Sequence, residues 1–393
     1  MGRPIIAFSK DWHEDPTSNH HVLRELAKTR RVVWLNSLST RTPSMSSRDL
    51  AKIKRKLLEF TVGPVNVERD LWVVTPLVLP MPHHPIARAV NRHVVRSTIE
   101  HVRERLAIRE FDLWTFLPNT GDYIGTLDEQ LTVYYCVDEW ASFPGLDAAA
   151  TREAERRLLG RVDATFATSR ALAAAKRAVC PNTFFAPHGV DYAKFARALS
   201  PATAVPDDLL AVPPPRLGFF GTLRDFIDYD LLAMIARRRP DWSIALIGQQ
   251  LSPHVAKLRD LPNVYFLGQK SHDELPAYCK GFDVGLVPYR MDDDVKFINP
   301  LKLREYLCAG LPVVTTAMPE VQPYAHLCYI ARSYDDALPA IERALAERSP
   351  SLSRRRSEAM RPETWSARVA DVVATLAEIE RYLTDVRARP TAA

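Results

Sequence analysis

The sequence of 393 residues lacks several features that would assign a protein class at once. No apolar run is long enough to cross a membrane. The opening PIIAFSK is typical of a short strand and not of a secretory signal peptide. The five cysteines are scattered, and no two form a CxxC pair, which argues against a structural zinc site and for a reducing compartment. We therefore expect a cytoplasmic protein.

Two recognition motifs are also missing. The stretch GFFGTLRD, which follows a predicted strand, lacks the complete GxGxxG fingerprint of nicotinamide-binding proteins. No basic and aromatic string of the RNP type accompanies the net charge of +5, so we rank nucleic-acid binding last among the functions considered and predict no nucleic-acid partner.

What is present indicates two α/β domains. A hydrophobic content of 47% and a charged content of 25% are ordinary for a globular protein of this length. Predicted strands alternate with predicted helices in both halves, which favours parallel, doubly wound sheets. We expect a first domain at 1–200, a proline-rich linker at 201–215, a second domain at 216–361 and, at 362–393, a long helix and tail that fold back across both.

The positive charge is concentrated in the first quarter of the chain. Residues 1–100 carry 16 Lys and Arg against 9 Asp and Glu, which gives +7, whereas the remainder is slightly acidic. Within it, SRDLAKIKRKLLEF (Ser47 to Phe60) predicts a basic amphipathic helix. Such a helix is typical of peripheral membrane contact on the cytoplasmic face, but a surface helix whose apolar stripe packs on the domain has the same pattern. Both interpretations stay open.

One stretch, NPLKLREYLCAGLPVVT at 299–315, has the pattern of a phosphate site. Pro300 suits the start of a helix, so Lys302 would lie in the first turn, beside free N–H groups that bind phosphate. Glu305 follows one turn later and could accept hydrogen bonds from ribose hydroxyls. The alternative is an ordinary helix with a solvated Lys–Glu pair.

Further signals stand where other predicted strands of this half end. Gly221 and Thr222 follow the first of them, and the strings IGQ, FLGQK and LVPY end three more. Ligands of open α/β sheets bind at the carboxyl ends of strands. Together with Lys302 and Glu305, these turns predict a nucleotide site.

The strings FFGTL, NVYFLGQKSHDELPAYCKGFDVGLVPY and NPLKLREYLCAGLPVV resemble the donor half of GT-B glycosyltransferases near family 4. YYCVDEW, ATS and HGVD in the first half resemble the same group, which includes exopolysaccharide and teichuronic-acid enzymes and a xanthan-type glucuronosyltransferase. The resemblance implies the GT-B fold, in which two Rossmann-like, doubly wound domains face each other across a cleft.

The resemblance also implies roles for individual residues of the donor half. The implied roles are diphosphate contact for Gly221 and Thr222, framing of the base for Phe266 and Gly268, packing near the nucleotide for Tyr289, phosphate binding for Lys302 and ribose binding for Glu305. Family 4 usually has a second glutamate eight residues before the last of these, and that position is Phe297 here. The departure favours an inverting mechanism over a retaining one.

In the first half, Asp138 of YYCVDEW is the candidate catalytic base. It would deprotonate the acceptor hydroxyl for attack on the anomeric carbon, whereas the alternative is an aspartate that caps a turn. His20 and His21 stand in the first βα region, and His188 precedes Gly189 after a short strand. All three are candidate contacts to the acceptor or the sugar, with helix-face or turn-capping positions as the alternatives.

We therefore expect a glycosyltransferase that moves a sugar from a UDP- or GDP-sugar to a hydroxyl of a lipid-linked or polysaccharide acceptor. The alternatives are a retaining transferase of the family 4 type and a sugar-nucleotide epimerase. No DxD string ends a predicted strand, so we expect no metal requirement, and the resemblance implies no cofactor other than the donor. Lys302 and helix N-termini would carry the charge of the diphosphate.

Overall fold

The computed structural model describes residues 2–38, 47–143, 145–347 and 349–388. The chain forms two compact units, one made of Met1–Pro187 with Arg368–Ala393 and the other of His188–Ala367. The first unit thus ends before the expected boundary at residue 200. The reason is that Val190 is already buried in the core of the second unit, where its N–H donates to the carbonyl of Glu363 at 2.8 Å.

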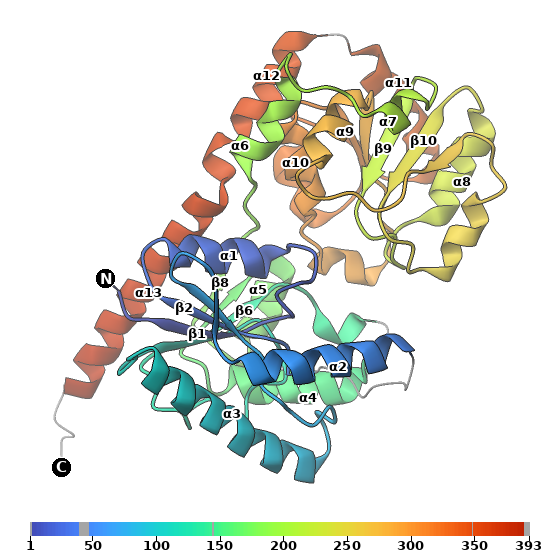
Figure 1. The fold of residues 1–393 in the computed structure, drawn as a ribbon. Coiled ribbons are helices and arrows are strands. Elements are labelled where there is room, and N and C mark those ends of the chain that lie inside the picture. Colours follow the sequence, from blue (N-terminus) through green and yellow to red (C-terminus); the bar gives the residue numbers. More distant parts are fainter. Residues whose placement is uncertain (1, 39–46, 144, 348, 389–393) are drawn as a thin grey trace. The chain divides into compact units, whose positions relative to one another are not determined.

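The first unit is built on an eight-stranded sheet (Figure 1). The strands are parallel except that β3 runs antiparallel to β4 at one edge. In spatial order they are β3 (Val65–Glu68), β4 (Leu71–Val74), β2 (Val32–Leu35), β1 (Ile5–Phe8), β5 (Asp112–Thr115), β6 (Thr132–Cys136), β7 (Ala164–Ala167) and β8 (Thr183–Phe185). The doubly wound sheet expected from the alternating pattern is confirmed, with β3 as an addition that the sequence did not predict.

Helices connect these strands and cover the sheet. They are α1 (Ser18–Ala27), α2 (Ser47–Val62), α3 (Pro85–Arg105), α4 (Ala148–Leu159) and α5 (Arg170–Arg177). The last helix, α13 (Trp365–Ala388), returns to this unit at Arg368. It buries Val369, Val372, Leu376 and Ile379, and Glu380 forms an ion pair with Arg3. Among the described residues, no helix combines the length and apolar character needed to span a bilayer.

The second unit contains a parallel sheet of six strands in the order β11-β10-β9-β12-β13-β14. The strands are β9 (Arg216–Phe220), β10 (Ser243–Ile247), β11 (Val264–Phe266), β12 (Val284–Val287), β13 (Val313–Thr316) and β14 (Tyr329–Ala331). Helices α6 (Tyr192–Phe195), α7 (Asp207–Leu210), α8 (Tyr229–Arg238), α9 (Leu275–Gly281), α10 (Leu301–Cys308), α11 (Tyr334–Ala346) and α12 (Pro350–Ala359) complete it. Alternation of helix and strand again produces the doubly wound arrangement.

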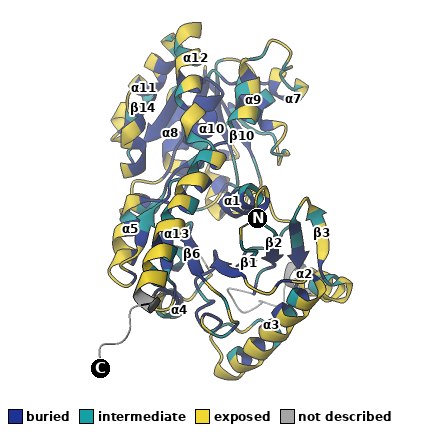
Figure 2. Cartoon of the chain, turned by 90° about the vertical axis from the view of Figure 1, so that its left-hand side faces the viewer, coloured by how far each residue is buried: buried dark blue, intermediate teal, exposed yellow. Residues whose placement is uncertain are grey.

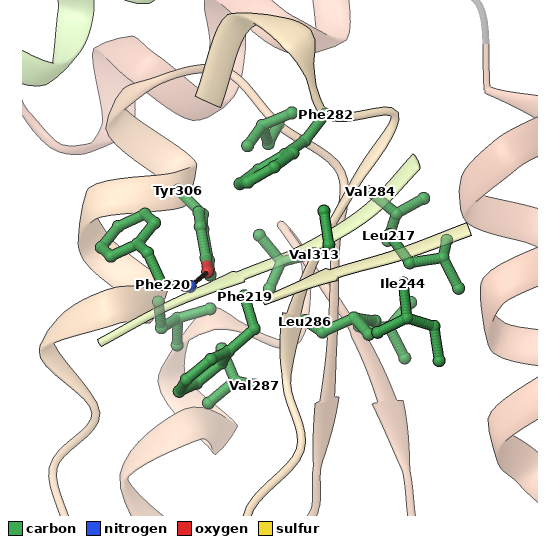
Figure 3. Packing of buried hydrophobic residues seen from close by; sticks show 14 of the residues in the cluster. Leu217, Phe219, Phe220, Ile244, Phe282, Val284, Leu286, Val287, Tyr306 and Val313 are labelled. Carbon is green, nitrogen blue, oxygen red and sulfur yellow. Dashed lines mark hydrogen bonds between the residues drawn. The ribbon is translucent and has the colours of Figure 1, made fainter. Parts of the chain in front are cut away.

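The core of this unit fixes α10 against the central strand β9. Figure 3 shows Tyr306 of α10 lying over β9, where its hydroxyl accepts a hydrogen bond from the N–H of Phe220 at 3.0 Å. The rings of Phe220 and Tyr306 meet edge to face with centroids 4.8 Å apart. Gly285 of β12 leaves room for this ring, since a Cβ there would lie 2.8 Å from Tyr306 Cγ. The helix that carries Lys302 and Glu305 is therefore held by its buried side.

The segment 201–215, expected to be a linker, lies inside the second unit and contains α7. Leu209 of this helix is fully buried, and Asp208 accepts hydrogen bonds from Lys270 and Tyr278 at 2.6 and 2.8 Å. The proline content predicted a free linker, but Leu209 of the string DDLL packs its side chain on α9.

The two crossings of the chain between the units lie side by side. Val190 and Thr364 form a parallel bridge, and a Cβ on Gly189 would come within 2.5 Å of the backbone nitrogen of Trp365. The ring of His188 lies 6.0 Å from that of Trp365. Both connections thus run through one small packed region of the second unit.

Candidate functional site

Three neighbouring strands of the second unit end in a glycine. Gly221 follows β9 with φ of 127°, Gly248 follows β10 with φ of 140°, and Gly268 lies just beyond β11 with φ of 73°. Gly221 donates to the carbonyl of Ile247, and Gly248 donates to that of Gly268, both at 2.8 Å. Because a Cβ on Gly248 would lie 2.1 Å from the carbonyl oxygen of Gly221, backbone packs directly on backbone here. The glycines of this edge thus pack main chain against main chain, with no Cβ between them.

Lys302 lies directly against the first of these glycines. A Cβ on Gly221 would come within 2.6 Å of Lys302 Nζ and 2.2 Å of its Cε. The ammonium is also 5.6 Å from the ring centroid of Phe219 in β9. The structure thus brings together the two residues that the sequence analysis assigned to the diphosphate, although 81 positions separate them (302 − 221).

The start of α10 adds hydrogen-bond donors beside this lysine. Pro300 is the N-cap residue and not the first helical residue, so the helix begins one residue later than expected, with Leu301 and Lys302. Their N–H groups have no partner within the helix, because the helical hydrogen bonds begin with Leu303, which donates to the carbonyl of Pro300 at 3.2 Å. A cation, a helix N-terminus and a glycine edge are features that favour the binding of an anion.

Glu305 lies one turn deeper and is nearly buried, at 5% exposure. Its Oε1 is 3.3 Å from His272 Nε2, and His272 Nδ1 lies 3.1 Å from Lys194 Nζ. The sequence analysis did not single out His272 or Lys194. The only hint was the position of His272 in the string QKSHD, directly after the loop that contains Gly268.

Other donor-half candidates occupy the same edge with different exposure. Thr222 and Phe266 are half-buried, so both can reach a ligand. Tyr289 is 4% exposed; its ring packs on Phe226 at 4.8 Å, and its carbonyl accepts a hydrogen bond from Thr316 at 2.7 Å. The Tyr289 ring is thus part of the packing beneath the edge.

Arg304 anchors α10 from its other side. This arginine is 2% exposed, and its guanidinium donates to Asn299 Oδ1 at 2.6 Å and to Glu363 Oε2 at 3.4 Å. Tyr324 also donates to Glu363 at 3.0 Å. The pair of buried Arg304 and half-buried Glu363 connects the helix that carries Lys302 to the segment where the chain leaves the second unit.

Phe297, at the position of the second family 4 glutamate, is half-buried beneath the ammonium of Lys296, which lies 5.1 Å from its ring centroid. The nearby Asp292 accepts a hydrogen bond from the N–H of Asp294 at 3.2 Å and so caps a short 3-10 turn. Within the described ranges, no three His, Cys, Asp or Glu side chains are grouped closely enough to hold a metal ion.

In the first unit, Asp138 is exposed just after the end of β6. The backbone around it is fixed on both sides. Thr168 donates its hydroxyl to the carbonyl of Val137 at 2.8 Å, and the Cys136 thiol lies 3.4 Å from the carbonyl of Asp138. Asp138 is thus an exposed residue on a fixed backbone at the carboxyl edge of the sheet.

A buried charge cluster lies next to this position. Lys176 Nζ is 2.7 Å from Glu155 Oε2 and 2.9 Å from Glu139 Oε2, while Tyr134 donates to Glu155 at 2.7 Å. Burial opposes the charged form of Lys176, but the surrounding Cys136, Glu155 and Glu139 raise its pKa above the usual value. The cluster fixes Glu139, the neighbour of Asp138, and sequence reasoning did not find it.

The candidate histidines differ in what they can offer. His20 is 2% exposed; its Nδ1 accepts from the Thr17 N–H at 3.3 Å, and its Nε2 lies 3.0 Å from the carbonyl of Trp12. Burial lowers the pKa of His20 to about 4, so it is neutral and serves the start of α1, with both ring nitrogens occupied. The helix-face alternative therefore describes His20 better than acceptor contact does, whereas its neighbour His21 is half-buried in the first turn of the helix.

His188 is 8% exposed, and burial together with the charge of Arg304 lowers its pKa to about 3. It lies in the packed region of the chain crossings, where its ring faces Trp365. A neutral, buried imidazole in this position supports the packing of residues 188–190, and a contact to the sugar stays a prediction.

Comparisons with known proteins agree with this geometry. Residues 214–346 match the family model described as Glycosyl transferases group 1. A stretch of 138 residues, 33% of this chain, is 30% identical to the putative teichuronic acid biosynthesis glycosyltransferase TuaH of Bacillus subtilis (strain 168). That alignment spans 35% of the length of the relative.

Solved structures resemble the chain over nearly its whole length. Sucrose-phosphate synthase from Thermosynechococcus elongatus is 16% identical with a TM-score of 0.67, over 98% of this chain and 100% of that one. Anabaena Alr3699/HepE in complex with UDP and glucose is 12% identical with a TM-score of 0.64, over 95% and 99%.

The chain therefore has the GT-B fold, as its motifs predicted. Residues 214–346 of its second unit, which holds the glycine edge and Lys302, match the model of the glycosyl transferases group 1 family.

Proposed function

We propose that the protein is a glycosyltransferase that takes a sugar from a nucleoside diphosphate donor, bound at the glycine edge of the second unit. The observation that carries this proposal is the contact between Lys302 and Gly221, beside the first turn of α10. The Lys302 ammonium, which can form charge-assisted hydrogen bonds, lies there beside the first N–H groups of α10, which lack helical partners. The group 1 family match of residues 214–346 supports the same assignment.

Each donor-site residue then has a chemical task. Lys302 and the N-terminal N–H groups of α10 would bind the diphosphate and stabilise it as the leaving group, which removes the need for a metal ion. Glu305, oriented by His272, would accept hydrogen bonds from the ribose hydroxyls. Phe266 and Gly268 would frame the base through their backbone. The nucleotide of the proposed donor is UDP or GDP, and the similar structure solved with UDP and glucose favours UDP.

For the chemistry we propose an inverting transfer with Asp138 as the base. Its exposed position at the end of β6 supports this role, as does the presence of Phe297 where a retaining family 4 enzyme has glutamate. The base takes the proton of the acceptor hydroxyl while the oxygen bonds to the anomeric carbon, and the bond from that carbon to the diphosphate breaks. His21 and His188 are proposed as further contacts to the acceptor or the sugar.

The acceptor class we propose is a hydroxyl of a lipid-linked or polysaccharide glycan. The similarity to a putative teichuronic acid biosynthesis enzyme favours such an acceptor. The reaction would take place at the cytoplasmic face of a membrane, where a lipid-linked glycan and a soluble donor meet.

The test is a panel of radiolabelled nucleoside diphosphate sugars with glycan and lipid-linked acceptors. Transfer or slow hydrolysis of one donor supports the proposal, and interconversion of the sugar without release of nucleotide would instead show an epimerase. Lys302→Ala should weaken UDP or GDP binding in calorimetry, while Lys257→Ala, which removes a surface lysine paired with Asp230, should not. Unchanged affinity of the Lys302 variant for both nucleotides would contradict the site.

A further inference from the structure

Helix α2 of the first unit is docked by its polar side. Lys56 Nζ is 3.1 Å from Asp11 Oδ1, and Arg55 contacts the other oxygen of Asp11 at 3.2 Å. Glu59 accepts hydrogen bonds from Thr75 at 2.9 Å and from Asn36 at 3.4 Å. Asp11 is nearly inaccessible, so these contacts are the inner face of the helix. An amphipathic helix on a globular domain normally turns its apolar side inward, and α2 does the reverse.

The apolar residues of α2 consequently face outward. Ile53, Leu57 and Phe60 follow one another at helical spacing and are 38%, 46% and 45% exposed. Leu58 and Val62, one turn apart, are more than 60% exposed. The alternative in which the apolar stripe packs on the domain is therefore wrong for these residues.

A second apolar group lies after β4 and at the start of α3. Leu77, Leu79 and Met81 are each about two-fifths exposed, on a segment held to α3 by two hydrogen bonds between the Leu79 backbone and the Asn91 side chain. Ile86 and Val90, one turn apart on α3, are 69% and 42% exposed. Figure 2 shows that much of α3 is exposed. The segment starts next to Thr75, which binds Glu59, so both groups extend from one end of β4.

The concentration of these side chains sets this region apart. Of the 18 large hydrophobic residues exposed in the described part of the chain, 11 fall within residues 53–90. Residues 77–97 contain three Arg and three His but no Asp or Glu. An apolar surface bordered by basic residues complements an anionic lipid surface, and residues 77–97 add no acidic side chain that would oppose it. The lipid headgroups would contact the cations, and the acyl region would take up the apolar side chains.

We propose that the outward side of α2, residues 77–81 and the first turns of α3 form a membrane-docking face for bilayers with anionic lipid. The inference deepens the proposed function by naming the surface on which a lipid-linked acceptor is met, and its test requires no transferase activity. Arg55 and Lys56 are engaged with Asp11, and Arg96 is paired with Glu100 at 3.0 Å. Insertion of apolar side chains therefore supplies most of the binding, and the exposed Arg92 adds a smaller electrostatic part.

The test is sedimentation of the full chain with vesicles of phosphatidylglycerol and phosphatidylcholine. We expect the wild type to sediment and to remain largely bound when salt is raised. Leu57→Gln with Leu58→Gln should lower the partition coefficient at least about tenfold. The matched control is Leu210→Gln with Leu251→Gln, two comparably exposed leucines of the second unit, which should leave sedimentation unchanged.

A fluorescent probe provides a second measurement that does not depend on a loss of binding. The native cysteines are all buried, so Leu58→Cys can be labelled selectively with an environment-sensitive dye. We expect its emission to shift to the blue on vesicles, whereas the same dye on Leu210→Cys should not respond. Binding that disappears at high salt and survives the double Leu→Gln change would overturn apolar insertion. A wild type that stays in the supernatant and elutes as a dimer would assign the face to a second copy of the chain.

Discussion

Replacement of Gly221 by alanine tests the donor site through its geometry. The new methyl group would have to occupy the space of Lys302, whose Nζ is 2.6 Å and whose Cε is 2.2 Å from the ideal Cβ position. Lysine is flexible, so it can swing away, but it then leaves the edge of β9. We expect nucleotide affinity to fall by about 10- to 150-fold, the equivalent of losing a charge-assisted hydrogen bond of about 1.5–3 kcal/mol.

A separate cost arises from the backbone of the same residue. The φ of 127° at Gly221 is a conformation that L side chains rarely adopt. Strain of this kind costs about 1–3 kcal/mol, so the melting temperature should fall by several degrees. Gly268→Ala is the control for backbone strain and melting temperature, because its φ of 73° is also positive but its Cβ would meet no atom within 4 Å. It should lose some stability with little effect on the position of Lys302.

The assay is calorimetric titration with UDP and GDP beside thermal melting, for Gly221→Ala, Gly268→Ala, Lys302→Ala and the double variant at 221 and 302. If the methyl group acts by displacing Lys302, the double variant should bind no more weakly than Lys302→Ala alone. Fully additive losses, or wild-type affinity in Gly221→Ala, would refute the placement of the phosphate between these two residues.

Three further predictions concern catalysis, pH and the buried cluster. Asp138→Asn should lower turnover by about 100- to 10,000-fold while nucleotide affinity and melting temperature stay nearly unchanged. If Asp138 only capped a turn, asparagine would replace it without loss of turnover. A product whose anomeric configuration is retained, as measured by NMR, would exclude Asp138 as the base of an inverting transfer. Since burial lowers the pKa of His188 to about 3, its neutral form stabilises the fold fully above pH 6.5. As the pH falls to 5, the free energy of unfolding should decrease by about 2 kcal/mol, and the melting temperature should fall with it. His188→Gln should remove this pH dependence, whereas replacement of the exposed His254 should not. Lys176→Met should destabilise the first unit by about 3–5 kcal/mol, because it leaves Glu155 buried without its cation, and adding Glu155→Gln should restore part of the melting temperature.

The donor edge could be predicted because its signals are local. A glycine directly after a β-branched or aromatic run marks a strand end, and Pro300 marks a helix start, so Gly221 and Lys302 were each placed from a few neighbouring residues. Parallel sheet topology then brings such ends together at one edge. The topology places Lys302 and Gly221 at the same edge, and the packing of Tyr306 on β9 then sets the contact between them.

Other features depend on partners that lie far away in the sequence, and these could not be predicted. The amphipathic pattern of α2 does not reveal which side docks, since that depends on Asp11 and Thr75 reaching Lys56 and Glu59. Likewise, His272 meets Glu305 only because the loop after β11 folds over α10. The basic residues of this helix pointed to contact with lipid, whereas in the structure Lys56 lies on the inner side of α2 and pairs with Asp11.

The adjacent crossings at Val190 and Thr364 bear on the order in which the protein is made. The second unit is one continuous insertion, residues 188–367, within a first unit that needs both Met1–Pro187 and Arg368–Ala393. During synthesis, the inserted unit can therefore complete its sheet while the first unit still lacks α13, whose Val369, Val372, Leu376 and Ile379 it buries last. Chains arrested before Arg368 should contain a protease-resistant second unit and a first unit whose apolar surface is still uncovered. We therefore expect nascent chains to depend on chaperones until α13 docks.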